Sequence, residues 1–325
     1  MQTSPVHATA IDAAVAALRR GELIGLPTET VYGLAADAMN ASAVAKIFAL
    51  KGRPSEHPLI VHLACAEQLS DWAIDLPDAA KLLAKAFWPG PLTLILKRAA
   101  RVGDWITGGQ STVGLRVPNH PLALRVLTAF GSGLAAPSAN RFGHVSPTTA
   151  GHVRAEFGAA LPIVLDGGAA AVGIESTIID LSQSLPRMLR PGQIGRREIE
   201  AVIGPITEGA AATSPRVSGS LRAHYAPHTP ALLCPRRQLA ARAHALAAAG
   251  RIALVLSIGD LPATTDGRAL PTQANGYAQQ LYAALRDLDA RAADCLLIEW
   301  PRKQRSWTAI RDRLQRAVAG STDAD

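Results

Sequence analysis

Cysteine, charged residues and long apolar runs are all scarce in this chain of 325 residues. Its three cysteines, Cys65, Cys234 and Cys295, lie far apart without a C-x-x-C pair. That pattern fits a reducing compartment and argues against a cysteine-based zinc site. No apolar run approaches the roughly 18 residues of a membrane span, and the first residues lack the basic start and apolar stretch of a secretory signal. We therefore expect a cytoplasmic protein with no membrane segment.

Acidic residues are outnumbered by basic ones, 26 against 33, which gives a net charge of +7 with neutral histidines. The 48% hydrophobic and 18% charged residues exclude wholesale disorder, because such a chain can bury a full core. The cationic excess suits an anionic partner such as a nucleotide or nucleic acid. Short basic clusters at 196–197, 236–237 and 302–305 leave RNA contact open, although most such clusters are solvated surface.

Length and composition indicate two α/β domains joined by a linker. Over residues 8–204, short strands with an apolar period of two are interleaved with helical stretches, which is typical of an α/β fold. After residue 204 the composition shifts towards Gly, Ala, Ser, Thr and Pro, and we expect a linker over 205–230. Helix and strand patterns over 231–320 predict a second, smaller α/β domain.

Local patterns also predict individual elements. Ser42 is expected to cap a helix that delivers Lys51 and Arg53 into the following loop. A period of two over 59–63 predicts a strand in which His62 lies on the face opposite Val61. Further strands are expected at 92–96, 113–117, 134–136, 163–165 and 177–181, helices at 78–87, 120–129 and 149–157, and a buried helical stripe at Tyr277, Leu281, Leu285 and Leu288.

Polar side chains gather at the ends of several predicted strands of the first domain. Ligands bind at such strand ends in open α/β sheets. Arg grips phosphate through a planar fork and Lys as a point charge, while hydroxyls and amides hold oxygens without adding charge. Each segment alone is also compatible with a capped turn. Together the side chains fit a polyanion and a small polar substrate. They are Thr28, Glu29, Thr30, Lys51, Arg53, Arg116, Ser138, Asn140, Ser146, Ser176 and Arg190.

Several common catalytic motifs are missing. The sequence has no G-x-x-x-x-G-K-[ST] P-loop and no G-x-S-x-G nucleophile elbow. His224 and His228 are four residues apart, but Pro227 between them argues against a helix that would place both on one zinc ion. We therefore predict no protein-bound metal site. The spacing of His57 and His62 is compatible with ordinary structural histidines.

A set of short strings occurs in a fixed order along most of residues 10–205. They read LPTETVYGLAADA from Leu26, KGRP and PLIVH between Lys51 and His62, WPGPLT from Trp88, GLRVP from Gly114, PSAN from Pro137, ESTIID from Glu175 and LRPG from Leu189. The ordered set resembles the YrdC-like threonylcarbamoyl-AMP synthases. With HYAP at 224–227 and the segment 312–314, the chain is similar to the long form of that family. The resemblance implies a YrdC-like open twisted sheet with flanking helices, followed by a smaller Rossmann-like domain.

The resemblance also implies a reaction. Members of the family act as nucleotidyltransferases that convert L-threonine, bicarbonate and ATP into threonylcarbamoyl-AMP and pyrophosphate, for threonylcarbamoyladenosine modification of tRNA. Mg²⁺ is expected to arrive with ATP, and a separate tRNA threonylcarbamoyl-transferase complex is the expected partner. Such chemistry depends on positioning and charge neutralisation, so a site without a strong general base is reasonable. We further hypothesise that the linker is a lid that covers the nucleotide.

The functional residues of the family carry over motif by motif. The catalytic signature around the nucleotide phosphates is matched by Lys51, Arg53, Ser138 and Asn140. Further ATP contacts are implied at His57, Thr112, Ser146, Arg190 and Tyr225. The threonine pocket is implied at Thr30, His62, Arg116, Ser176 and, through its backbone, Ala136.

Three other functions remain open on the residues alone. An RNA- or tRNA-binding protein would show affinity that falls steeply with salt and would consume no ATP. A related carbamoyl-AMP-forming domain that acts on carbamoyl phosphate usually belongs to a larger multidomain protein, and no zinc-finger or acylphosphatase-like segment is present here. A scaffold whose second domain recruits the transferase complex could coexist with synthase activity.

Overall fold

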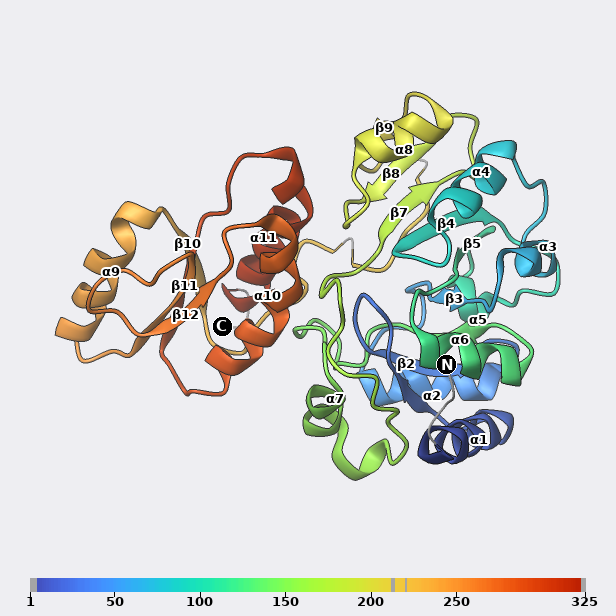
Figure 1. Ribbon diagram of the computed structural model, residues 1–325, viewed down its shortest axis with the longest axis horizontal. Coiled ribbons are helices and arrows are strands. Elements are labelled where there is room, and N and C mark those ends of the chain that lie inside the picture. Colours follow the sequence, from blue (N-terminus) through green and yellow to red (C-terminus); the bar gives the residue numbers. More distant parts are fainter. Residues whose placement is uncertain (1–4, 212–213, 220, 323–325) are drawn as a thin grey trace. The chain divides into compact units, whose positions relative to one another are not determined.

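The computed structural model describes residues 5–211, 214–219 and 221–322, which form two compact units (Figure 1). Unit 1 consists of the described parts of Met1–Arg141, Pro147–Ala171 and Glu175–Ser220. Unit 2 consists of Phe142–Ser146, Val172–Ile174 and the described part of Leu221–Asp325. Unit 2 therefore includes two short segments from within the first predicted domain, and one of them carries Ser146.

Unit 1 is built on an open, mixed sheet with the strand order β1-β2-β6-β3-β5-β4-β7-β8-β9. Three neighbouring pairs, β3–β5, β4–β7 and β8–β9, are parallel. The strands are β1 (Ile24–Leu26), β2 (Gly33–Asp37), β3 (Ile60–His62), β4 (Leu92–Lys97), β5 (Thr112–Arg116), β6 (Leu134–Ala135), β7 (Thr177–Asp180), β8 (Arg187–Arg190) and β9 (Thr207–Glu208). The prediction of a strand at 163–165 is wrong, because only Val164 of this segment forms a β-bridge, which pairs it with Gly25 of β1.

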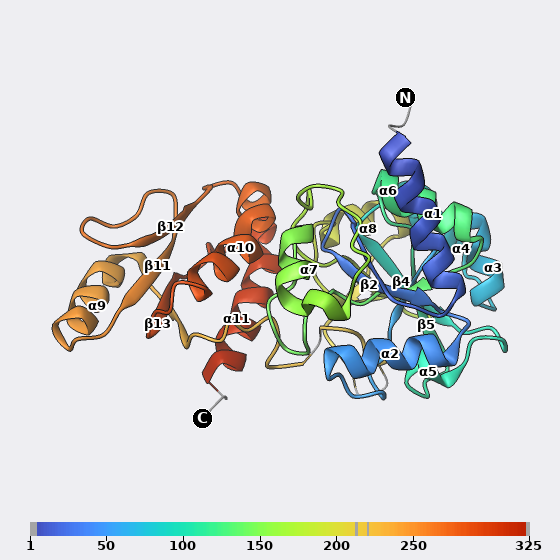
Figure 2. The same cartoon turned by 90° about the horizontal axis from the view of Figure 1, so that it is seen from below.

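Helices cover both faces of this sheet (Figure 2). In β2, Leu34 and Ala36 pack into the core on the α2 side, whereas Ala35 packs into a second core with α1 and α6. This alternation is the period of two of a strand buried on both faces. The helices of unit 1 are α1 (Pro5–Arg19), α2 (Ala41–Lys51), α3 (Leu69–Trp72), α4 (Asp78–Phe87), α5 (Asp104–Thr107), α6 (Pro121–Phe130), α7 (Ala150–Phe157) and α8 (Arg196–Ile203), with 3₁₀ turns η1 (Ala66–Gln68) and η2 (Gly158–Ala160). The helices expected at 78–87, 120–129 and 149–157 are thereby confirmed.

Helix α2 positions the first pair of predicted site cations. Its N-cap is Asn40 rather than the expected Ser42, since the Asn40 side chain accepts a hydrogen bond from Ala43 N at 3.1 Å and the helix begins one residue before Ser42. Its C-cap is Gly52, in the left-handed region at a φ of 61°. The chain therefore turns sharply between the last helical residue, Lys51, and the first loop residue, Arg53.

Unit 2 contains a parallel sheet with the strand order β10-β13-β11-β12. Its elements are β10 (Ala231–Cys234), α9 (Arg236–Ala248), β11 (Ala253–Ile258), β12 (Gly267–Leu270), α10 (Ala274–Asp289), β13 (Cys295–Glu299), η3 (Arg305–Trp307) and α11 (Thr308–Thr322). The predicted stripe of α10, from Tyr277 to Leu288, is buried and belongs to the core. The strands are parallel, and helices α9 and α10 connect β10 to β11 and β12 to β13, which gives the expected Rossmann-like arrangement. Among the described residues, no helix combines the length and apolar character that crossing a membrane requires.

Candidate active site

Lys51 joins two of the predicted motifs of unit 1. Its side chain is buried, and Nζ donates hydrogen bonds to the backbone oxygens of Ser138 at 2.6 Å and Asn140 at 2.5 Å. Burial, with a smaller effect of the Arg53 charge, holds the pKa of Lys51 well below its ordinary value. Lys51 and Ser138 are 87 positions apart in the sequence, so the KGRP and PSAN strings meet through one ammonium group.

The turn after β1 contacts the same PSAN loop. Leu34 N–H donates to Pro137 O at 2.7 Å, and Ala139 N–H donates to Tyr32 O at 2.8 Å. Within the turn, Thr28 Oγ1 accepts hydrogen bonds from the backbone of Thr30 and from that of the next residue, both at 3.2 Å. Thr28 thus caps its turn locally, as in the capped-turn alternative given from the sequence.

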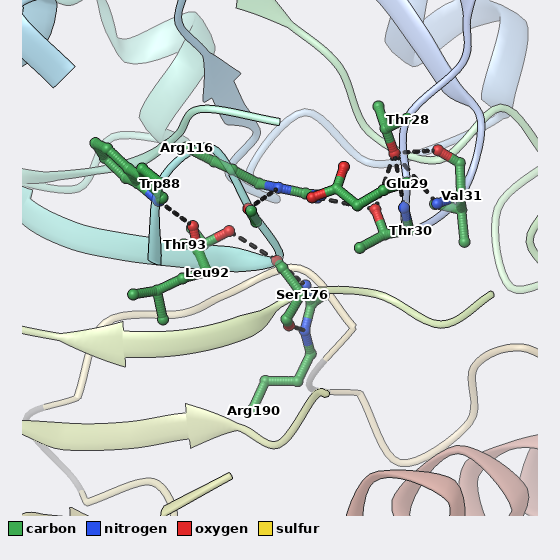
Figure 3. Close-up of polar contacts among 11 residues, drawn as sticks. Thr28, Glu29, Thr30, Val31, Trp88, Leu92, Thr93, Arg116, Ser176 and Arg190 are labelled. Atoms are coloured by element: carbon green, nitrogen blue, oxygen red, sulfur yellow. Dashed lines mark hydrogen bonds and ion pairs between the residues drawn. The ribbon is translucent and has the colours of Figure 1, made fainter. Parts of the chain in front are cut away.

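Arg116 is the centre of a buried polar cluster (Figure 3). Its Nη1 donates to Thr30 Oγ1 at 2.9 Å, its Nε donates to Gly90 O at 3.2 Å, and its Nη2 lies 2.7 Å from Glu29 Oε1. Arg116 and Glu29 are 4% and 6% exposed. Sequence reasoning noted Glu29 as a carboxylate in a strand-end turn but gave it no role. Only the folded sheet reveals that this carboxylate faces Arg116.

Ser176 lies between two further polar side chains (Figure 3). Its Oγ is 2.8 Å from Thr93 Oγ1 and accepts a hydrogen bond from Arg190 Nη2 at 3.1 Å. Arg190 Nε also donates to the backbone oxygen of Ser176 at 3.0 Å. A residue expected at the threonine and a residue expected at ATP are therefore in direct contact. Thr93 was not predicted, since its partner comes from a strand far away in the sequence.

His62 pairs with Arg116 in the register of β3 and β5. Burial, and then the Arg116 charge, lowers the pKa of His62 to about 3, so its imidazole is neutral near pH 7. Ala136 donates its backbone N–H to Ile60 O at 3.1 Å. His57 lies in the loop after Arg53, where burial and the Arg53 charge also lower its pKa. Both histidines thus lie beside the predicted cations.

The predicted linker begins as strand β9 and then crosses the cations of unit 1. Ser218 Oγ donates to Pro58 O at 2.9 Å and accepts from Arg53 Nη2 at 3.1 Å, while Arg190 Nη1 donates to Ser218 O at 2.8 Å. The neighbouring Val217 is buried against the sheet. The docked segment leaves a cavity of about 10 Å³ beside Thr112, which is room for one water molecule. Ser218 thus contacts two side chains expected to hold ATP.

Two predicted ATP contacts, Ser146 and Tyr225, belong to unit 2, whereas the other predicted site residues belong to unit 1. Tyr225 is buried and has a φ of 63°, which is uncommon for a residue other than glycine. Its ring stacks on Tyr282 at 5.7 Å, and the Arg313 guanidinium lies 5.3 Å from the ring centroid. In the part of the chain that the structure describes, no three His, Cys, Asp or Glu side chains gather into a group that could hold a metal ion.

Comparisons with known proteins cover nearly the whole chain. A family model described as telomere recombination matches residues 16–192, and one described as the C-terminal domain of threonylcarbamoyl-AMP synthase matches residues 194–319. The threonylcarbamoyl-AMP synthases of Pyrococcus abyssi and Bacillus subtilis are each 39% identical, over 92% and 94% of this chain and 91% and 92% of their own. A crystal structure of P. abyssi Sua5 complexed with L-threonine matches with a TM-score of 0.92 and 36% identity, over 99% of this chain and 96% of that one. Full-length HypF, at 18% identity and a TM-score of 0.50 over 28% of its chain, shares the fold alone.

Proposed function

The chain belongs to the long form of the YrdC-like threonylcarbamoyl-AMP synthases, and we propose that it forms threonylcarbamoyl-AMP and pyrophosphate from L-threonine, bicarbonate and ATP. The observation that carries the proposal is the contact of Lys51 with the backbone of Ser138 and Asn140 in unit 1. It assembles a cationic loop and a small polar loop next to the buried Arg116 cluster. The threonine complex of a relative that matches over nearly all of its length supports the same substrate.

The threonine pocket is proposed at Thr30, His62, Arg116, Ala136 and Ser176. Arg116 is the buried cation that suits a carboxylate, because its planar fork can donate two parallel hydrogen bonds. The neutral imidazole of His62 offers a polar contact without adding charge. Because the N–H of Ala136 is already bonded within the sheet, its backbone contact would use the carbonyl oxygen.

The nucleotide site is proposed at Lys51, Arg53, Ser138 and Asn140, with further contacts from His57, Thr112, Ser146, Arg190 and Tyr225. ATP would enter with Mg²⁺ on its phosphate oxygens, which suits a cation that keeps several waters and few protein ligands. Phosphates on Arg53 and Arg190 would compete with the present contacts of Ser218. The linker over 205–230 would then move and close over the bound nucleotide as a lid.

The proposed chemistry has two steps. The amine of threonine attacks the carbon of bicarbonate, which gives a carbamate and releases water. A carbamate oxygen then attacks the α-phosphorus of ATP, the bond to the bridging oxygen of the β-phosphate breaks, and pyrophosphate leaves. Lys51, Arg53 and Arg190 would hold the phosphates in line and neutralise the charge that develops on them. This makes the protein a nucleotidyltransferase, and we place it in the cytoplasm, where a tRNA threonylcarbamoyl-transferase complex would consume the product.

The test is pyrophosphate release by the purified full chain with Mg-ATP and bicarbonate, with and without L-threonine. We expect release that requires threonine and falls at least about 100-fold in Lys51→Ala and Ser138→Ala, since both remove contacts around the phosphates. Lys97→Ala, which removes an exposed lysine of β4 paired with Asp75, is the matched control and should retain activity. Folded protein without threonine-dependent release would refute the synthase assignment, and a salt-dependent tRNA titration would then test RNA binding.

A further inference from the structure

A buried carboxylate lies in the proposed threonine pocket without an assigned role. Glu29 is 6% exposed, and neither of its side-chain oxygens accepts a hydrogen bond from the described residues. Its partner is the guanidinium of Arg116, whose Nη2 lies 2.7 Å from Glu29 Oε1 (Figure 3). Burying a carboxylate with so few hydrogen bonds is costly. Such an arrangement in a ligand site indicates that the oxygens have a further partner when the ligand is bound.

The charges around Glu29 match those of an amino acid. A zwitterion carries an anionic carboxylate and a cationic ammonium on neighbouring atoms, and Arg116 and Glu29 present the opposite charges side by side. A carboxylate on Arg116 would bring its ammonium within reach of Glu29. The negative charge of Glu29 also acts on His120. Burial lowers the pKa of His120, and the Glu29 charge raises it in part.

The remaining basic groups of the pocket are poor acceptors for the ammonium proton. Arg116 is a permanent cation and cannot take a proton. His62 is neutral, with a pKa lowered to about 3, so it binds a proton only weakly. Glu29 is the carboxylate in contact with Arg116, and neither of its oxygens accepts a hydrogen bond from the described residues, so both keep lone pairs that can receive the ammonium proton.

We propose that Glu29 binds the ammonium group of L-threonine and accepts the proton that this group must lose before the amine can attack. The inference rests on the proposed function and adds an acid–base residue to it. One N–H bond of the ammonium breaks and one O–H bond forms on Glu29. The free amine then reacts with bicarbonate to give the carbamate and water. On this proposal one buried carboxylate acts as the base of a site that the sequence led us to expect without a strong general base.

The first experiment measures binding rather than turnover. The wild-type full chain and Glu29→Gln are titrated with L-threonine and with 2,3-dihydroxybutanoate of the same configuration, which keeps the carboxylate and β-hydroxyl but replaces the ammonium by a hydroxyl. We expect wild type to prefer threonine, and Glu29→Gln to lose about 10- to 100-fold of that preference. If Glu29 only supported Arg116, both ligands would weaken equally and the preference would not change. That result would overturn the proposal.

The second experiment separates proton transfer from binding. At saturating threonine, kcat of Glu29→Gln should fall by about 100-fold or more, as for loss of a general base. An unchanged kcat would overturn the proton-transfer part. Asp180→Asn removes another buried carboxylate of unit 1, which is bonded to Ser182 outside the pocket, and should change neither readout. Because the ligand preference needs no turnover, failure of this inference remains distinct from failure of the proposed reaction.

Discussion

The buried imidazole of His62 makes the stability of the protein depend on pH in a direction that can be calculated. Its pKa is about 3 in the folded protein, against an ordinary value of 6.5, because burial and the Arg116 charge disfavour the imidazolium. The unfolded chain therefore binds the proton first, so the stabilisation is present above pH 6.5 and is lost as the pH falls towards 3. One pKa unit corresponds to about 1.36 kcal/mol, so acidification to about pH 4.5 should remove about 2.7 kcal/mol.

The assay is urea unfolding of wild type and His62→Gln between about pH 7 and pH 4.5, followed by near-ultraviolet circular dichroism. Glutamine keeps a polar side chain of similar reach but does not titrate, so the difference in unfolding free energy between the two proteins should shrink by about 2 to 3 kcal/mol over this range. His244→Gln, at an exposed histidine of α9, should show no such change relative to wild type. If the difference in unfolding free energy between wild type and His62→Gln did not change with pH, the lowered pKa of His62 in the folded protein would be refuted.

Two further substitutions test the pocket and the linker. Arg116→Lys keeps the charge but loses the fork, so the Kd for threonine should rise about 10- to 100-fold in calorimetry while the affinity for ATP stays the same; equal losses for both ligands would contradict a carboxylate-specific role. Val217→Asp would bury a charge where a methyl group now packs on β4 and β7, so the linker should undock and trypsin should cleave after Arg216 about tenfold faster or more. An unchanged cleavage rate would show that Val217 does not hold the linker.

Elements whose signal lies within a few neighbouring residues were predicted well from the sequence. Helix α4 matches the expected bounds of 78–87, because its apolar period is local. The segment 163–165 has the same local pattern as a strand, yet only Val164 bridges the short edge strand β1. Strands β8 and β12 were not predicted, because both are short and only partly buried and carry basic side chains. Each of the two forms as a strand because it pairs with a neighbour, β8 with β7 and β12 with β11.

Candidate site residues were predicted by motif, but the partners of those residues were not. Lys51 was expected at phosphate, and the structure adds that it bonds the backbone of Ser138 and Asn140. The sequence placed Glu29 in a turn, but its role depends on the ion pair with Arg116, which lies on a strand far along the chain. Contacts of this kind come from tertiary packing, so no spacing within the sequence could indicate them.

The way in which the cations are held suits the proposed nucleotide site. Lys51, Arg53 and Arg190 each donate to backbone carbonyl oxygens, which satisfy N–H groups but carry no net charge. A carbonyl dipole therefore stabilises the buried donor and leaves its positive charge available for phosphate oxygens. Arg116 differs, because its partner is the carboxylate of Glu29. A charged pair suits a zwitterion and carbonyl-held cations suit a phosphate chain, so the proposed threonine and ATP sites would use different electrostatic means.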